Sequence, residues 1–181
     1  MNKRERASEI SIDLEGTKKV IALSRAYNIK MIFLSTTSAH QDAKSYYARN
    51  KLVAESLFDT RKDLILKLGL VIGGHGGLFG KIAASLKKFK IVPLIGGGRQ
   101  HIQTIALDDL CRIIAAGIKK NITGKFFIAH PSVLTMKEVY RKIADHIGVR
   151  TLFIPVPLTA MYRCFQLAEW AGLKLPFTSE S

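Results

Sequence analysis

Short apolar runs alternate along the chain with longer segments in which apolar residues recur every three or four positions. Runs of the first kind predict strands buried on both faces, and segments of the second kind predict amphipathic helices. We expect strands at residues 29–34, 64–72, 103–107, 126–129 and 151–156. We expect helices at residues 13–27, 45–60, 78–89, 110–119 and 132–148, and a last helix ending at about residue 172. This alternation is typical of α/β architecture with a mainly parallel sheet.

Two of the predicted helices carry capping signals. Asp108 and Asp109 stand where an N-cap is expected before the helix at residues 110–119. Thr135 is expected to act as an N-cap, and Glu138, three residues later, completes a capping box. These signals predict where both helices begin.

Composition narrows the class of protein. The 181 residues are 48% hydrophobic, which is normal for one globular domain and argues against disorder. Cys111 and Cys164 fall on predicted helices and are expected to be core thiols; two cysteines cannot build a disulfide framework. This favours a reducing compartment and a cytoplasmic location. No apolar run reaches the roughly 20 residues of a membrane span, and the charged N-terminus predicts no signal peptide. The five histidines show no metal-ligand spacing, so we expect no metal.

A hydroxyl-rich run and a Tyr–Lys pair carry the candidate chemistry. Ser35-Thr36-Thr37-Ser38 follows the strand at residues 29–34, and Tyr47 and Lys51 are one helical turn apart on the next helix. A tyrosine phenol has a pKa of about 10, and a neighbouring ammonium group favours the phenolate. With Thr37 holding a substrate oxygen, the pair predicts a proton-transfer centre that makes or breaks a carbonyl. The alternative is an ordinary solvated helix face.

These residues resemble the catalytic region of extended short-chain dehydrogenases/reductases, the NAD(P)-dependent epimerases and dehydratases of nucleotide sugars. Residues 66–73 are similar to that family's Arg-Pro-x-x-Val-Tyr-Gly strand, with Lys67-Leu68 in place of Arg-Pro and Ile72 in place of Tyr. Residues 96–110 resemble the loop, strand and capped helix of its substrate lobe. The resemblance is nearest to atypical members related to an accessory subunit of respiratory complex I. It implies a partial Rossmann-like fold, with a doubly wound, mainly parallel sheet and a small α/β substrate-binding lobe.

The family's first strand and its Gly-x-x-Gly-x-x-Gly cofactor loop do not precede the hydroxyl run. We therefore expect residues 1–181 to be the C-terminal portion of one NAD(P)-binding domain, a fragment or the product of a truncated gene. Residues 10–75 would be the remainder of the Rossmann-like core with the Tyr–Lys pair. Residues 76–181 would be mostly substrate lobe with returning core elements.

The resemblance implies catalytic roles for the matching residues. Tyr47 would be the general acid/base. Lys51 would favour the phenolate of Tyr47 and bind the nicotinamide ribose hydroxyls of NAD or NADP. Thr37 would orient the substrate hydroxyl, with Thr36 or Ser35 as the alternative.

The resemblance also implies binding residues. Besides the Tyr–Lys pair, Thr36, Gly69 and Leu70 would lie along the cofactor. Arg99 would pair with a substrate phosphate, since its forked guanidinium suits phosphate oxygens. His75, in a glycine-rich loop, would lie against the substrate.

Three functions compete. The first is an NAD(P)-dependent epimerase, dehydratase or oxidoreductase acting on a nucleotide sugar or similar anionic small molecule, as a homodimer. The second is a catalytically inactive scaffold relative, like the complex I accessory subunit. The third is binding of nucleic acid or an anionic membrane, suggested by the net charge of +14 and by a basic group at Lys81, Lys87, Lys88 and Lys90. No known nucleic-acid module is present, so we expect no nucleic-acid partner.

Overall fold

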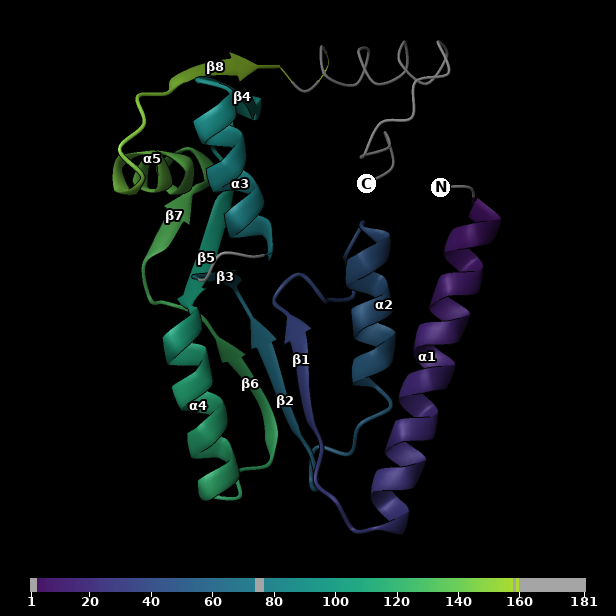
Figure 1. Ribbon diagram of the computed structural model, residues 1–181. Coiled ribbons are helices and arrows are strands. Elements are labelled where there is room, and N and C mark those ends of the chain that lie inside the picture. Colours follow the sequence, from purple (N-terminus) through teal and green to yellow (C-terminus); the bar gives the residue numbers. More distant parts are fainter. Residues whose placement is uncertain (1–2, 74–76, 158, 160–181) are drawn as a thin grey trace. The chain divides into compact units, whose positions relative to one another are not determined.

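The computed structural model describes residues 3–73, 77–157 and 159, and for residues 3–13, 77–79 and 81 it describes the backbone alone. These residues divide into two compact units. One comprises the chain up to Gly69 together with residues 109–128, and the other comprises residues 70–108 together with the chain from Ala129 onward. In chain order the elements are α1 (Lys3–Ala26), β1 (Ile32–Thr36), α2 (Tyr46–Glu55), β2 (Leu64–Leu68), β3 (Leu70–Ile72), α3 (Gly77–Lys88), β4 (Ile91–Ile95), the 3-10 turn η1 (Gly96–Gly98), β5 (His101–Ala106), α4 (Leu107–Lys119), β6 (Gly124–Ile128), β7 (Val133–Thr135), α5 (Met136–His146) and β8 (Leu152–Val156) (Figure 1).

The first unit is built on a parallel sheet in which β2 is the central strand, between β1 and β6. The register places Ser35 of β1 beside Lys67 of β2, and Lys67 beside Phe127 of β6. All five residues of β2 are buried, which explains why its sequence is an almost unbroken apolar run. The predicted mainly parallel α/β architecture is confirmed.

Helices cover both faces of this sheet. Alternate residues of a strand point to opposite sides, so Leu64 and Lys67 of β2 lie on different faces. On one face α4 lies so close to β2 that a Cβ added to Gly117 would come within 2.8 Å of Leu64 Cδ2. On the other face Glu55 of α2 reaches the side chain of Lys67. The sheet of the first unit is therefore doubly wound.

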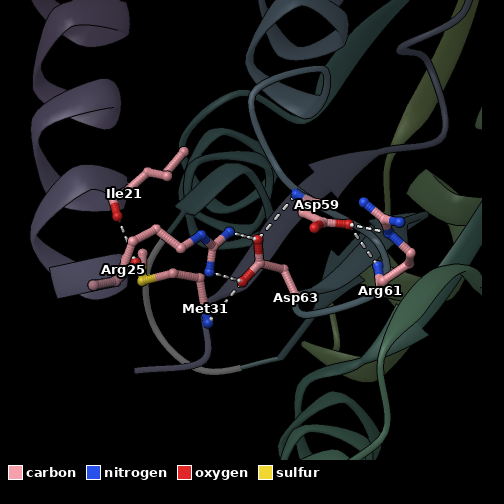
Figure 2. Close-up of polar contacts among 7 residues, drawn as sticks. Ile21, Arg25, Met31, Asp59, Arg61 and Asp63 are labelled. Atoms are coloured by element: carbon pink, nitrogen blue, oxygen red, sulfur yellow. Dashed lines mark hydrogen bonds and ion pairs between the residues drawn. The ribbon is translucent and has the colours of Figure 1, made fainter. Parts of the chain in front are cut away.

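The carboxylate of Asp63 lies just before β2 and joins three segments of the first unit (Figure 2). Arg25, near the end of α1, donates one hydrogen bond to Asp63 Oδ1 at 2.9 Å and a second to Oδ2. The backbone N–H of Met31 donates to Oδ1 and that of Asp59 to Oδ2, each at 3.1 Å. The side chain of Asp63 is fully buried, so these donors replace the water that it loses on folding.

The charge of Asp63 makes the first unit sensitive to acid. Burial opposes ionisation, but the hydrogen bonds from Arg25, Met31 and Asp59 outweigh it and hold the pKa of the Asp63 carboxyl below its ordinary value. A carboxyl with a lowered folded-state pKa stabilises the protein above its unfolded pKa of about 3.9. That stabilisation is lost as the pH falls through the folded-state pKa.

The second unit contains two small sheets within its described residues. In one, β5 pairs in parallel with β3 and antiparallel with β7. In the other, β4 and β8 pair in parallel. Helices α3 and α5 pack with β4 around one hydrophobic core, which contains Ile82, Leu86, Val92, Leu94, Val139, Ile143 and Ala144.

The structure corrects several predicted elements. The single strand expected at residues 64–72 is two strands separated at Gly69, and they belong to different units. Helix α4 begins at Leu107, so Asp108 and Asp109 lie in its first turn instead of capping it; negative charge there still complements the helix dipole. The short strand β7 was not predicted, because three residues carry too little periodicity. Helix α5 begins at Met136, directly after the predicted N-cap Thr135, so residues 132–135 do not belong to it.

Other sequence expectations have mixed outcomes. The capping box is confirmed: Thr135 Oγ1 accepts a hydrogen bond from Glu138 N at 3.2 Å, and Glu138 Oε2 accepts one from Thr135 N at 2.7 Å. Cys111 is exposed, so its prediction as a core thiol is wrong. Cys164 and most of the predicted last helix lie outside the described residues. None of the described helices combines the length and the apolar character needed to cross a bilayer.

We expect Asp63→Asn to lower the free energy of unfolding at neutral pH by roughly 3 kcal/mol. The guanidinium of Arg25 would lose its countercharge, and the N–H₂ of the asparagine would face N–H groups that also donate. Urea unfolding at several pH values measures this loss. The stability of the wild-type protein should fall below about pH 4, and the variant should lose part of that dependence.

The matched control is Arg61→Gln. This change removes the Arg61–Asp59 ion pair, in which the Arg61 side chain is 90% exposed. We expect the urea midpoint of this variant to match that of the wild type within error, since exposed pairs contribute little. Equal losses in the two variants would contradict the role assigned to Asp63.

Candidate active site

The hydroxyl-rich loop after β1 is fastened to the end of β2. Thr37 N donates to the backbone oxygen of Leu68 at 2.9 Å, and Ala39 N donates to that of Thr36 at 3.1 Å. The ammonium group of Lys67, in β2, donates to the backbone oxygen of Ala39. The loop therefore has a defined place at the carboxyl end of two parallel strands, where ligands of open α/β sheets bind.

The Tyr–Lys pair lies in the first two turns of α2. Ser45 is the N-cap of this helix, and its hydroxyl accepts a hydrogen bond from Ala48 N at 3.2 Å. The side chain of Tyr47 is 61% exposed. Lys51 Nζ lies 6.0 Å from the centre of the Tyr47 ring and donates to the backbone oxygen of Leu34 at 3.3 Å. Lys51 thus contacts β1, and Tyr47 lies one turn before it on an exposed side of α2.

Three hydroxyl groups were predicted as alternatives for holding the substrate, and the structure places them differently. Ser35 is 5% exposed, and its hydroxyl donates to Glu55 Oε1. Thr36 Oγ1 accepts a hydrogen bond from Ser38 N at 3.2 Å and keeps its own proton for another acceptor. Thr37 is half-buried in the loop. Thr36 and Thr37 are therefore better placed than Ser35 to contact a ligand.

Behind this loop lies a buried ion cluster, which we define as Ser35, Glu55, Lys67 and Lys125. Lys67 Nζ is 2.9 Å from Glu55 Oε1, and Lys125 Nζ is 2.9 Å from Glu55 Oε2. The side chains of Glu55 and Lys67 are 1% and 6% exposed. The cluster joins α2, which carries the Tyr–Lys pair, to all three strands of the sheet.

Glu55 is ionised in this cluster. Burial opposes its ionisation, but hydrogen bonds from Ser35, Lys125 and Lys67 outweigh burial and hold the pKa of Glu55 below its ordinary value. Sequence reasoning missed the cluster. The available signal was Lys67 itself, because a charge in the middle of an apolar strand requires a buried partner.

The remaining predicted residues lie in different places. Gly69 N donates to the backbone oxygen of Ile128 at 3.0 Å, next to the end of β2 in the first unit. Leu70 is half-buried in β3 and Arg99 is exposed after η1, and both belong to the second unit. His75 lies outside the described residues. Of the predicted site residues, Thr36, Thr37, Tyr47, Lys51 and Gly69 thus belong to the first unit.

The groups on α2 and on the loop are of the types that transfer protons. Helix α2 carries the phenol of Tyr47 and the ammonium group of Lys51, and the loop carries the hydroxyls of Thr36 and Thr37. Such groups can hold a hydroxyl or carbonyl oxygen and exchange a proton with it. Within the part of the chain that the structure describes, no three His, Cys, Asp or Glu side chains are grouped to hold a metal ion.

Neither a protein-family profile nor a curated protein matches the chain, but solved structures do. A dTDP-4-dehydrorhamnose reductase from Bacillus anthracis str. Ames, in complex with NADP, matches with a TM-score of 0.74 and 19% identity, over 88% of this chain and 62% of that one. A dTDP-4-dehydrorhamnose reductase from Clostridium acetobutylicum ATCC 824 matches with a TM-score of 0.72 and 14% identity, over 83% and 60%. The dTDP-glucose 4,6-dehydratase DesIV from Streptomyces venezuelae, with NAD bound, matches with a TM-score of 0.64 and 18% identity, over 87% and 58%.

These matches establish the fold. The chain has a mixed α/β, Rossmann-like fold with mainly parallel sheets, as the resemblance in the sequence implied. It spans about three fifths of the length of the solved structures that it matches.

We expect Glu55→Gln to lower the free energy of unfolding by roughly 3 kcal/mol, because two ammonium groups would lose their shared countercharge. Urea unfolding measures the loss. Glu15→Gln is the matched control, since it removes the exposed ion pair with Lys18 on α1, and it should leave the urea midpoint unchanged. An unchanged midpoint for Glu55→Gln as well would show that the buried ion cluster contributes nothing to stability.

Proposed function

We propose that the protein is an NAD(P)-dependent epimerase, dehydratase or reductase acting on a nucleotide sugar or a similar anionic substrate. The observation that supports this proposal is that the Thr36–Thr37 loop lies at the carboxyl end of two parallel strands, while Tyr47 and Lys51 share α2 and Lys51 donates to the backbone oxygen of Leu34 in β1. In such chemistry a proton leaves or joins a substrate oxygen while a hydride moves between carbon atoms.

Each residue has a role in this proposal. Tyr47 acts as the general acid/base, and its exposed phenol is accessible to a substrate. Thr37 orients the reacting oxygen, with Thr36 as the alternative on the same loop. Arg99, exposed in the second unit, would pair with a substrate phosphate.

The cofactor fits the chemistry of these groups. When bound, NAD or NADP would supply the hydride acceptor or donor. Lys51 would hold the nicotinamide ribose, because an ammonium group has three donors and the backbone oxygen of Leu34 takes one. Thr36, Gly69 and Leu70 would complete the contacts with the cofactor. The NADP and NAD complexes among the matching structures support this assignment.

A scaffold role is the second candidate. The observation that favours it is that residues 66–73 depart from the strand pattern of the resembled family, with Lys67-Leu68 in place of Arg-Pro and Ile72 in place of Tyr. A scaffold would keep the fold without using the Tyr–Lys pair. Turnover and cofactor binding distinguish the two functions.

We expect Tyr47→Phe to lower kcat about 10²- to 10⁴-fold in the natural full-length protein, because phenylalanine keeps the ring and removes the transferable proton. The reaction is followed by nicotinamide absorbance and by chromatography of dTDP- and UDP-sugars. Tyr46→Phe, which alters the adjacent phenol on α2, is the control and should keep wild-type kcat. Full activity in Tyr47→Phe would remove Tyr47 from the mechanism, and no turnover by the wild type would favour the scaffold role.

We expect the natural full-length protein to bind NAD or NADP, and Lys51→Met to weaken that binding about tenfold, which corresponds to one charge-assisted hydrogen bond. Fluorescence titration with each reduced cofactor measures both Kd values. Lys44→Met, which removes an exposed lysine before α2, should bind as the wild type does. Loss of affinity in both variants would point to a general charge effect, contrary to the role given to Lys51.

A further inference from the structure

The second unit contains a cavity of about 1060 Å³ that the proposed function does not use. All of its lining residues belong to this unit, and Arg99 is not among them. The cavity lies between the facing sides of α3 and α5, and residues of β3, β5 and β7 complete its walls. Its volume lies just above the range of small-molecule sites, about 300–1,000 Å³.

The inner wall of the cavity is apolar. Ile72 of β3, Leu134 of β7 and Ile147, which follows α5, line it and are half-buried, so part of each side chain stays accessible. Ala83 of α3 adds a small side chain to the lining. Such a wall gains free energy by excluding water from an aliphatic ligand.

The rim of the cavity is basic. Lys87 of α3, His130 before β7, and Lys142 and His146 of α5 all line it and are all exposed. Lys142 and His146 are one helical turn apart, so they share a side of α5. Among the described residues that line the cavity, none is acidic. Of the two carboxylates on α5, Glu138 is engaged in the capping box, and Asp145 does not line the cavity.

The lining also indicates which kind of anion fits. A nucleobase is usually held by an aromatic side chain, and no aromatic residue is among the described residues of the lining. An apolar wall with a cationic rim instead matches a molecule with an aliphatic body and an anionic end. We propose that this cavity binds a single-chain amphiphile with a phosphate headgroup, its alkyl chain against Leu134 and Ile147 and its phosphate between Lys87 and Lys142.

Isothermal titration calorimetry of the full-length protein with dodecyl phosphate, below its micellar concentration, tests the proposal. We expect saturable binding. Dodecanol, which lacks the charge, and inorganic phosphate, which lacks the chain, should each bind at least about tenfold more weakly. Equal binding of inorganic phosphate would overturn the amphiphile in favour of a free anion. Tighter binding of UDP would overturn it in favour of a nucleotide, and no binding of dodecyl phosphate would overturn it outright.

Matched variants locate the site. Lys87→Gln and Lys142→Gln should each weaken dodecyl phosphate binding about tenfold, because each removes one charge-assisted contact. Lys88→Gln and Arg141→Gln alter the neighbouring charges on α3 and α5 that do not line the cavity, and they should keep the wild-type Kd. All four positions are exposed, so the variants should fold as the wild type does. Equal weakening in all four would show non-specific attraction to a basic surface and would overturn the proposed site.

Discussion

The buried carboxylate of Asp63 is the interaction on which the first unit most depends. This carboxylate accepts hydrogen bonds from the two terminal guanidinium nitrogens of Arg25 and from two backbone N–H groups. The backbone oxygen of Asp63 also accepts a hydrogen bond from Gly124 N at 2.9 Å. Leu64 N donates to the backbone oxygen of Met31 at 2.9 Å. One residue therefore sets where α1 ends and where β1, β2 and β6 begin. A carboxylate can stay ionised in a buried place only when donors surround it. The arrangement of these donors therefore favours one conformation of the chain as well as stabilising it.

The buried ion cluster performs a related task at the other end of the same sheet. Glu55 and Lys67 hold α2 against β2, and Lys67 also binds the backbone oxygen of Ala39 in the hydroxyl-rich loop. The buried ion cluster does not include Tyr47 or Lys51. It holds in place both α2, which carries these two residues, and the hydroxyl-rich loop. A site that must hold a proton donor within hydrogen-bond reach of a substrate needs such support, because side chains on a loosely held helix lose catalytic geometry.

Much of the fold could be predicted from the sequence, because the signals are local. Apolar runs located β1, β5 and β8, and the Thr135–Glu138 capping box was read correctly from two residues three positions apart. The prediction failed where the deciding contact was tertiary. Leu64 to Ile72 is one apolar run, yet the chain divides at Gly69. Cys111 lies on an amphipathic helix, yet it is exposed. Local periodicity does not say which strand pairs with which, or how completely a helix face is covered.

The sequence by itself determined the longer helices, several strands and the spacing of Tyr47 and Lys51, since helical and strand periods act over a few residues. Only the tertiary structure decided which charges are buried and what they bind. Arg25 meets Asp63 across 38 positions of sequence, and Lys125 meets Glu55 across 70. The basic rim of the cavity likewise combines Lys87 of α3 with Lys142 and His146 of α5, which are distant in the sequence. The net charge of +14 does not reveal that Lys67 is buried against Glu55 while other lysines are exposed around a cavity, because burial depends on contacts between distant segments.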